Sequence, residues 1–184
     1  MVAGLMSTTR AATSVATALR LTGLPSMVSD KTGLLILGSF PGAASLAAQQ
    51  YYAHPQNQFW RILTAIFAFG PRPDCMDSYE KRSEWLLSKG LGLWDVYAFC
   101  ERAGSLDSAI RNPEVNDFAS LARRCPNLVA IAHNGGESFK HAKHTAALGL
   151  PVYKLPSTSP ANASWSFERK LAAWREVMAA AGLA

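Results

Sequence analysis

The stretch Leu34-Leu35-Ile36-Leu37, followed by Gly38-Ser39-Phe40-Pro41-Gly42, decides how this chain of 184 residues folds. Four consecutive apolar residues are typical of a strand that is buried on both faces, as in a parallel sheet. The glycines after the run favour a turn and allow a ligand to approach the backbone closely. The stretch therefore predicts a buried parallel strand that leads into a loop at a ligand site.

Three further short apolar runs have the same character, and longer stretches with helical spacing of apolar residues separate them. The strands are expected at 34–37, 93–97, 128–132 and 152–155. The helices are expected at 57–69, 78–89, 115–124, 136–148 and 165–181. This alternation of strands and helices predicts an α/β fold whose parallel sheet is covered by helices on both faces.

The composition indicates one globular domain over residues 21–184. Hydrophobic residues make up 49% and charged residues 17% of the chain, which is not the composition of a disordered protein. No apolar run approaches the roughly 20 residues that span a bilayer, so we expect no membrane partner and a cytoplasmic protein. Residues 1–20 are rich in alanine, serine and threonine and contain no acid, which is typical of a transit peptide or of a loosely ordered extension. The chain shows no oligomerisation signal, so a monomer is expected.

The cysteines and histidines show no spacing that would hold a metal. Cys75, Cys100 and Cys125 lie far apart and form no C-x-x-C pair, which favours free thiols in a reducing compartment. His141 and His144 are three residues apart but have no evident third ligand. We therefore expect no metal and no cofactor.

The formal net charge of +5 is concentrated in the C-terminal third of the chain. Residues 123–184 carry eight basic residues against three glutamates. Such asymmetry is typical of a face that binds phosphates, and an ordinary solvated surface is the equal alternative.

In parallel α/β folds the ligand lies beyond the carboxyl ends of the strands, so the segments that follow the strands carry the functional signal. The loop 38–42 lacks the GK[ST] of an ATP-binding loop, the G-x-G-x-x-G of a dinucleotide fold and the G-x-S-x-G of a serine hydrolase. The stretch 51–60 places two tyrosines, a histidine and an asparagine before an apolar helix. Asn57 there can cap the helix, or it can join the tyrosines as the wall of a pocket for a flat ligand.

Two further strand ends carry polar side chains. Asn134 precedes two glycines, which suits either a tight turn or an amide that meets a ligand. The segment 156–163 places hydroxyl and amide side chains on a proline-containing turn before the last helix. That composition suits contacts to a phosphate backbone, or a helix cap with ordinary turns around it.

These segments together resemble family six of the uracil-DNA-glycosylase superfamily, the hypoxanthine-DNA (deoxyinosine) glycosylases. The resemblance is carried by GSFPG and ASL, QYYAHPQNQFW, LWDVYAFCERAGSLDSAI, the Asn134-Gly135 strand end and LPSTSPANA, and it runs from about Leu24 to Trp174. It implies a three-layer αβα fold around a central four-stranded parallel sheet. It also implies an enzyme of base-excision repair, a monofunctional DNA glycosylase without a cofactor. Such an enzyme flips a deaminated base, hypoxanthine above all, out of DNA and hydrolyses its N-glycosidic bond.

The resemblance also implies roles for single residues. Asn57 takes the place of the family's catalytic amide and would hold the hydrolytic water, while Ser39 stands where other members of the superfamily have a carboxylate or an asparagine. Tyr52 would stack on the flipped base, and Asn134 would read its edge. The remaining base-binding candidates are Gly38, Phe40, His54 and His133. The loop that grips the DNA backbone and fills the vacated stack comprises Ser157, Thr158, Ser159, Pro160 and Asn162.

His133 departs from the pattern of the family, in which this position is apolar or aromatic. Its imidazole would either add a hydrogen-bond donor near the pocket or pack at the strand end. The sequence shows no pair of carboxylates and no lysine at a motif position, so we expect simple hydrolysis without a Schiff base. Two alternatives stay open. One is a uracil- or mismatch-specific glycosylase of the same fold, and the other, suggested by Ser39, is a DNA-binding module without activity.

Overall fold

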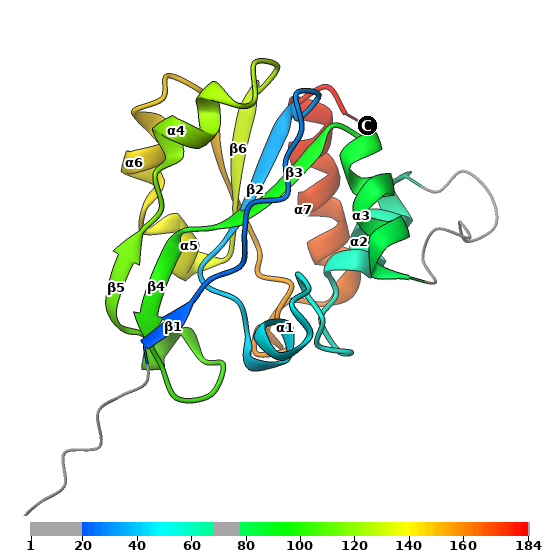
Figure 1. The fold of residues 1–184 in the computed structure, drawn as a ribbon. Coiled ribbons are helices and arrows are strands. Elements are labelled where there is room, and N and C mark those ends of the chain that lie inside the picture. The colour runs from blue at the N-terminus through cyan, green and yellow to red at the C-terminus, as the bar shows by residue number, and fades with distance from the viewer. Residues whose placement is uncertain (1–19, 68–77, 184) are drawn as a thin grey trace, which may run out of the picture.

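The centre of the protein is a parallel sheet of four strands (Figure 1). The computed structural model describes residues 20–67 and 78–183. The strands are β2 (Leu34–Gly38), β3 (Leu91–Asp95), β6 (Ala130–Asn134) and β7 (Val152–Leu155), in the order β3-β2-β6-β7. All three pairings are parallel, which confirms the predicted sheet.

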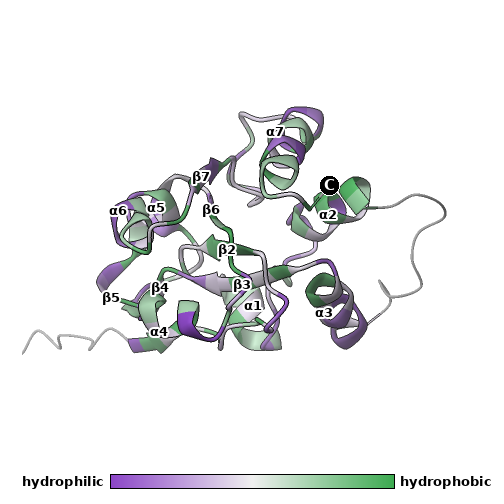
Figure 2. Ribbon diagram, turned by 90° about the horizontal axis from the view of Figure 1, so that it is seen from above, coloured by the Kyte–Doolittle hydropathy of each residue, from purple (hydrophilic) through white to green (hydrophobic). Residues whose placement is uncertain are grey.

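Helices cover both faces of this sheet, as Figure 2 shows from above. One layer consists of α2 (Phe59–Phe67), α3 (Tyr79–Ser88) and α7 (Phe167–Ala180). The other consists of α4 (Phe118–Arg123), α5 (Gly136–Phe139) and α6 (Ala142–Ala146). Successive side chains of β2 point to opposite faces, so Leu34 and Ile36 pack with α2 and α7, whereas Leu35 and Leu37 pack with α4. The three-layer αβα fold is therefore confirmed.

A small antiparallel sheet lies beside the central one and was not predicted. It contains β1 (Arg20–Thr22), β4 (Tyr97–Glu101) and β5 (Arg111–Val115) in the order β1-β4-β5. The predicted strand 93–97 is wrong at its end, because the parallel strand stops at Asp95 and Tyr97 already belongs to β4. Val96 and Tyr97 are both buried in the hydrophobic cluster that also contains Leu35 and Leu37. The apolar pattern of the sequence therefore continues from one strand into the next without a visible boundary.

The other corrections concern short elements. The predicted helix 136–148 is two helices, α5 and α6, and His141 in the break between them lies 2.8 Å from the hydroxyl of Tyr97. The helix α1 (Ala43–Ala48) and the single turn η2 (Asp107–Ala109) were not predicted. The third strand begins two residues later than expected and ends at Asn134.

Several predictions concern the ends of the chain and its surroundings. The proposed N-terminal extension falls on residues 1–19, outside the described part, and Arg20 opens β1. The single domain over 21–184 stays a prediction. Cys75 also lies outside the described residues, while Cys100 and Cys125 are buried free thiols. Within 20–67 and 78–183, no helix is both long and apolar enough to cross a membrane.

The register of the sheet brings the ends of its strands together. Gly38 pairs with Asp95, and Asn134 pairs with Leu155. These residues end their strands at one edge, since all four strands run in the same direction. The carboxyl edge of the sheet therefore presents two polar side chains, Asp95 and Asn134, next to the loop that follows Gly38.

Candidate functional site

A cavity of about 990 Å³ opens at this carboxyl edge, the place expected for a ligand in a parallel α/β fold. Its size lies at the upper end of the range for small-molecule pockets, about 300–1,000 Å³. The last residues of all four parallel strands line it: Gly38, Asp95, Asn134 and Leu155. The other walls come from the segments 39–45, 51–57 and 105–108 and from the loop 156–162. Parts of the chain that lie far apart in the sequence thus meet in one hollow.

Asn57 lines the cavity and also caps the helix α2. Its side-chain Oδ1 accepts a hydrogen bond of 3.0 Å from the backbone N–H of Phe59. Its backbone N–H donates to the backbone carbonyl of His54 over 2.9 Å. A side-chain carbonyl oxygen has two lone pairs, so one remains for a ligand. The sequence offered capping and a place in the pocket wall as alternatives for Asn57. In the structure Asn57 does both.

Tyr52 is held tightly in the cavity wall. Its ring stacks on Phe59 with the ring centroids 3.9 Å apart and the planes 18° from parallel. The backbone of Tyr52 has φ 55°, a left-handed conformation that costs an aromatic residue about 1–3 kcal/mol and is concentrated at functional sites. Burial raises the pKa of the Tyr52 hydroxyl far above its ordinary value, so the phenol stays neutral. The structure thus positions a flat, uncharged ring at the ligand site.

Asn134 is 8% exposed and uses both of its side-chain N–H groups inside the protein. One donates to the hydroxyl of Tyr52 over 3.1 Å and the other to Oγ1 of Thr158 over 3.0 Å. Its Oδ1 accepts from the backbone N–H of Thr158 at 3.0 Å. An amide has only two N–H donors, so reading an acceptor atom of a base would break one of these bonds. Asn134 thus ties Tyr52 to the loop 156–162, and one lone pair of its Oδ1 remains for a donor atom of a ligand.

His133 is fully buried and does not line the cavity. Its Nδ1 lies 2.8 Å from Oγ of Ser138 and its Nε2 lies 2.9 Å from Oγ1 of Thr145. Burial lowers the pKa of His133 to about 4, so its ring is neutral at physiological pH. In the structure His133 packs at the strand end, which is one of the two alternatives that the sequence left open.

The loop 156–162 is held in shape by its own polar groups. Thr158 is fully buried, and its Oγ1 accepts a hydrogen bond from Asn134. The hydroxyls of Ser157 and Ser159 accept from backbone N–H groups two residues further on, and Asn162 donates to the carbonyl of Ser157 at 3.0 Å. Pro160 is exposed. The large apolar side chain at the cavity comes from another segment, where Leu106 is 60% exposed.

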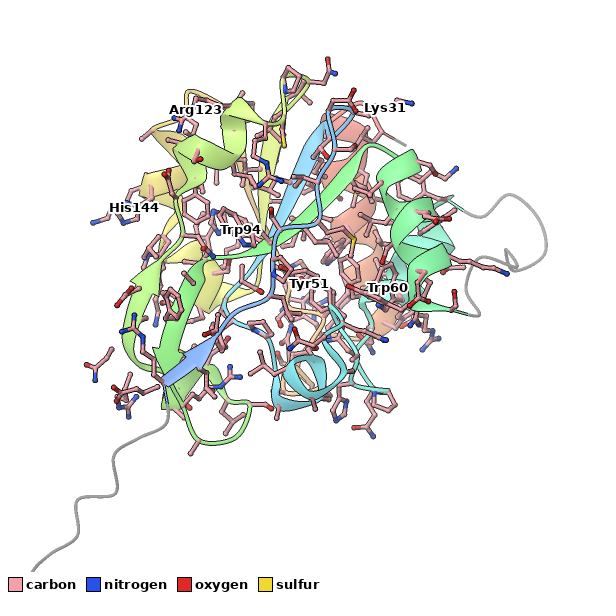
Figure 3. The ribbon with its side chains drawn as sticks, in the orientation of Figure 1. Lys31, Tyr51, Trp60, Trp94, Arg123 and His144 are labelled. Atoms are coloured by element: carbon pink, nitrogen blue, oxygen red, sulfur yellow. The ribbon has the colours of Figure 1, made fainter. Side chains whose placement is uncertain are left out.

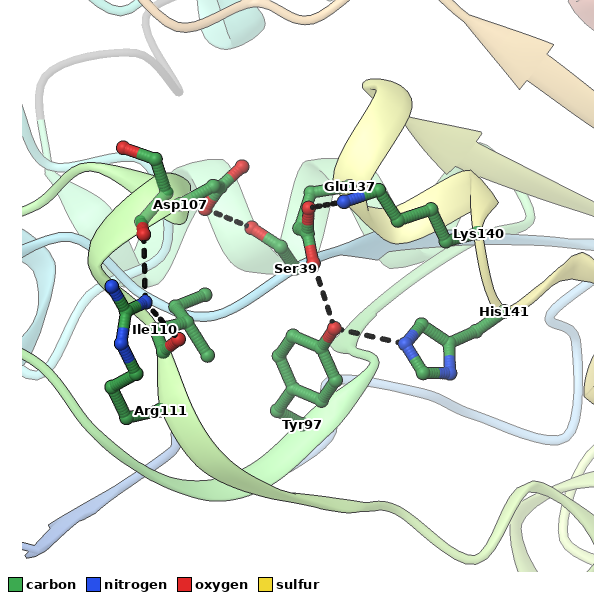
Figure 4. Close-up of polar contacts among 9 residues, drawn as sticks. Ser39, Tyr97, Asp107, Ile110, Arg111, Glu137, Lys140 and His141 are labelled. Atoms are coloured by element: carbon green, nitrogen blue, oxygen red, sulfur yellow. Dashed lines mark hydrogen bonds and ion pairs between the residues drawn. The ribbon is translucent and has the colours of Figure 1, made fainter.

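Ser39 and Phe40 are bound to the segment that follows β4. The hydroxyl of Ser39 donates to Oδ1 of Asp107 over 2.6 Å (Figure 4). Phe40 is 6% exposed and lies under the guanidinium of Arg102 at 5.1 Å, and Arg102 also donates to the carbonyl of Pro41. His54, the remaining candidate, is exposed at the cavity. The hydroxyl of Ser39 therefore binds a carboxyl group that also lines the cavity.

Two carboxyl groups, Asp95 and Asp107, line the cavity although the sequence suggested no pair. Asp95 is 4% exposed, and burial raises its pKa to about 7, with the charge of Asp107 adding to the rise and Arg102 opposing it. A Cβ atom at Gly38 would collide with Oδ1 of Asp95, which explains the glycine there. Asp95 ends β3 but stood in the middle of the predicted strand 93–97, so its place at the carboxyl edge was not predicted. Asp107 lies in an unpredicted turn and gave no signal either.

A second polar cluster lies beside Ser39 and Asp107 (Figure 4). The hydroxyl of Tyr97 donates to Glu137 over 2.9 Å and lies 2.8 Å from Nε2 of His141, while Lys140 binds Glu137 at 2.6 Å. These contacts join β4 to α5 and α6. Among the residues that the structure describes, no group of three histidine, cysteine or acidic side chains is placed to hold a metal ion.

The basic residues of the C-terminal third do not form one face. Lys154 lines the cavity, whereas Lys170 is only 2% exposed. Arg123 lies near the top of the view in Figure 3, and α1, which borders the cavity, lies at the bottom of the same view in Figure 1. Position in the sequence therefore did not predict where the charge lies in space.

Comparisons with known proteins agree with this geometry. The family model described as the uracil DNA glycosylase superfamily matches residues 25–178. A hypoxanthine DNA glycosylase of Methanosarcina acetivorans is 38% identical over 148 residues, which cover 80% of this chain and 92% of the relative. A hypoxanthine DNA glycosylase of Methanosarcina barkeri is 36% identical over 155 residues, which cover 84% of this chain and 95% of that relative. The solution structure of a candidate uracil DNA glycosylase from Methanosarcina acetivorans matches with a TM-score of 0.74 and 35% identity, covering 86% of this chain and 99% of that protein.

Proposed function

This chain belongs to the uracil DNA glycosylase superfamily, and we propose that the base it releases is hypoxanthine, from deoxyinosine in DNA. As a member of the superfamily it is a DNA glycosylase, a hydrolase that acts on N-glycosyl bonds. The observation that carries the choice of base is its similarity over most of its length to two relatives named for hypoxanthine. The cavity of about 990 Å³ leaves room for a purine.

The target nucleotide must leave the stack before its glycosidic bond can be reached. Unstacking costs a few kcal/mol, and the cost is smaller for a mispaired base. Tyr52 offsets part of this cost by stacking on the flipped base, because its ring is already fixed against Phe59. The role of Asn134 is then to hold Tyr52 in place through the hydrogen bond to the phenol.

Asn57 positions the attacking water. The free lone pair of its Oδ1 accepts one water hydrogen, while the bond to the N–H of Phe59 keeps the oxygen from turning away. Cleavage of the C1′–N bond places positive charge on the sugar. Asp107, exposed to solvent and bound to Ser39, supplies the negative charge that stabilises it. Ser39 thus acts by orienting Asp107.

The DNA is held at the mouth of the cavity. Ser157, Ser159 and Asn162 offer hydroxyl and amide groups to phosphates, and Lys154 adds a positive charge. The side chains of the loop 156–162 are too small to replace a base. Leu106 is large, apolar and 60% exposed, and apolar side chains of this kind insert between base steps in many DNA-binding proteins. Leu106 therefore fills the vacated stack.

Base release from labelled duplexes tests this proposal. Duplexes with inosine, uracil, xanthine or ethenoadenine are incubated with enzyme, and abasic products are cleaved with alkali. Release from inosine that is lost in Asn57→Ala supports the proposal. Release from uracil but never from inosine favours the alternative specificity, and binding to inosine DNA without release favours the binding module. The monomeric state and the cytoplasmic location stay predictions from the sequence.

A further inference from the structure

The carboxyl group of Asp95 lines the cavity and has a buried oxygen without a hydrogen-bond partner within the described residues. It lies at the end of β3 and is 4% exposed. The oxygen without a partner is Oδ2. No lysine or arginine of the described residues comes within ion-pair distance of the carboxyl either, since the described ion pairs join Arg20 to Glu114 and Lys140 to Glu137. A buried carboxyl without a partner is costly and is expected where a ligand supplies the partner.

The groups around Asp95 favour its neutral form. Asp107, on the turn η2, acts on Asp95 with a like charge. The charge of Arg102 opposes this effect and is the smallest of the three causes. Its Nε and Nη2 donate to the carbonyls of Gly104 and Pro41, while its Nη1 has no hydrogen-bond partner within the described residues. Tyr51 and Tyr52 face it as neutral phenols whose pKa values are raised. His54 and Lys154 line other parts of the cavity.

We propose that Asp95 recognises the flipped base in its protonated form, with its carboxyl O–H donating a hydrogen bond to an acceptor atom on the edge of the purine. This inference rests on the proposed function and names the group that reads the base. Asn134 cannot fill that role without breaking a bond to Tyr52 or Thr158. Gly38 supports it, since any side chain at position 38 would displace the carboxyl.

The chemistry of bond cleavage favours the same protonation state. The departing base carries negative charge, which a neutral O–H donor stabilises and an ionised carboxylate would repel. Burial raises the pKa of Asp95 to about 7, so the neutral form predominates below neutral pH, is about half of the total near pH 7 and is lost above it. Activity should therefore fall as the pH rises through this value.

Single-turnover base release from inosine duplexes between about pH 5.5 and pH 9 tests the inference. The wild-type rate should fall about tenfold per pH unit above pH 7. Asp95→Asn cannot ionise and keeps an N–H donor, so its rate should not show this fall. Asp95→Leu has no donor, and its rate at pH 6 should drop by about fivefold to 150-fold. Asp117→Asn is the matched control. Asp117 caps α4 and does not line the cavity, and asparagine can also cap a helix.

Two results would overturn the inference. One is a pH profile of Asp95→Asn that matches the wild type, and the other is full activity of Asp95→Leu. A wild type that releases no base refutes the proposed function instead, so binding provides a separate readout. In an Asn57→Ala background, preference for inosine duplex over normal duplex should be present with Asp95 and lost with Asp95→Leu. A preference that survives, or that never exists with Asp95 intact, rejects the inference whatever the turnover.

Discussion

Replacing Asp95 by asparagine should change how the stability of the fold depends on pH. The carboxyl is 4% exposed, and burial raises its pKa from 3.8 to about 7. Below pH 3.8 the carboxyl is neutral in the folded and in the unfolded chain, so it costs nothing. Between these two values the folded protein binds more protons than the unfolded chain, so stability falls as the pH rises. Above about pH 7 the full cost of the buried charge is present.

The size of the effect follows from the two pKa values. They differ by about three pH units, and each unit corresponds to about 1.36 kcal/mol, which gives about 4 kcal/mol as an upper limit. Asparagine has nearly the same shape and cannot ionise. Asp95→Asn should therefore gain up to about 4 kcal/mol over the wild type at about pH 8 and show no such gain at about pH 4.

Urea unfolding of both proteins between about pH 4 and pH 8 measures this difference. The comparison must be between the two proteins, because His133 contributes a slope of the opposite sign in the wild type and the variant alike. A difference in unfolding free energy that is the same at both ends of the range would refute the reasoning, since the charge of Asp95 would then cost nothing.

Four further predictions concern named side chains. Asn57→Ala should lose most turnover while DNA binding survives, and should lower stability by about 1 kcal/mol through the lost cap; unchanged turnover measured by base release would disprove the water-positioning role. Tyr52→Ala should weaken binding of inosine duplex by about 1–3 kcal/mol in a fluorescence titration, and wild-type affinity would mean that the ring only packs. Leu106→Ala should slow release from duplex more than from single strands, which kinetics on both substrates can check. The pKa of His133, lowered from 6.5 to about 4, predicts a stability contribution that is present above pH 6.5 and lost as the pH falls toward 4; His133→Gln should remove it, and an unaltered acid slope on urea unfolding would contradict this.

The parallel sheet could be predicted from the sequence because burial on both faces leaves an unbroken apolar run. The run 34–37 becomes β2, and its side chains enter the cores on both sides of the sheet. The antiparallel sheet could not be predicted. Tyr97 is buried as deeply as a residue of the parallel sheet, so the change of sheet at Val96 leaves no mark in the apolar pattern. Edge strands such as β5 are exposed and carry no such pattern at all.

The sequence by itself determined the family, the order of the strands along the chain, and the segments that meet at the site, because these depend on local patterns and motifs. Only the tertiary structure decided what each side chain does there. Both N–H donors of Asn134 are taken by Tyr52 and Thr158, His133 points into the protein, and Oδ2 of Asp95 is left without a partner within the described residues. The physical reason is that hydrogen bonds and burial join residues far apart in the chain. The free donors and acceptors of a site are those that remain after the fold has satisfied the others.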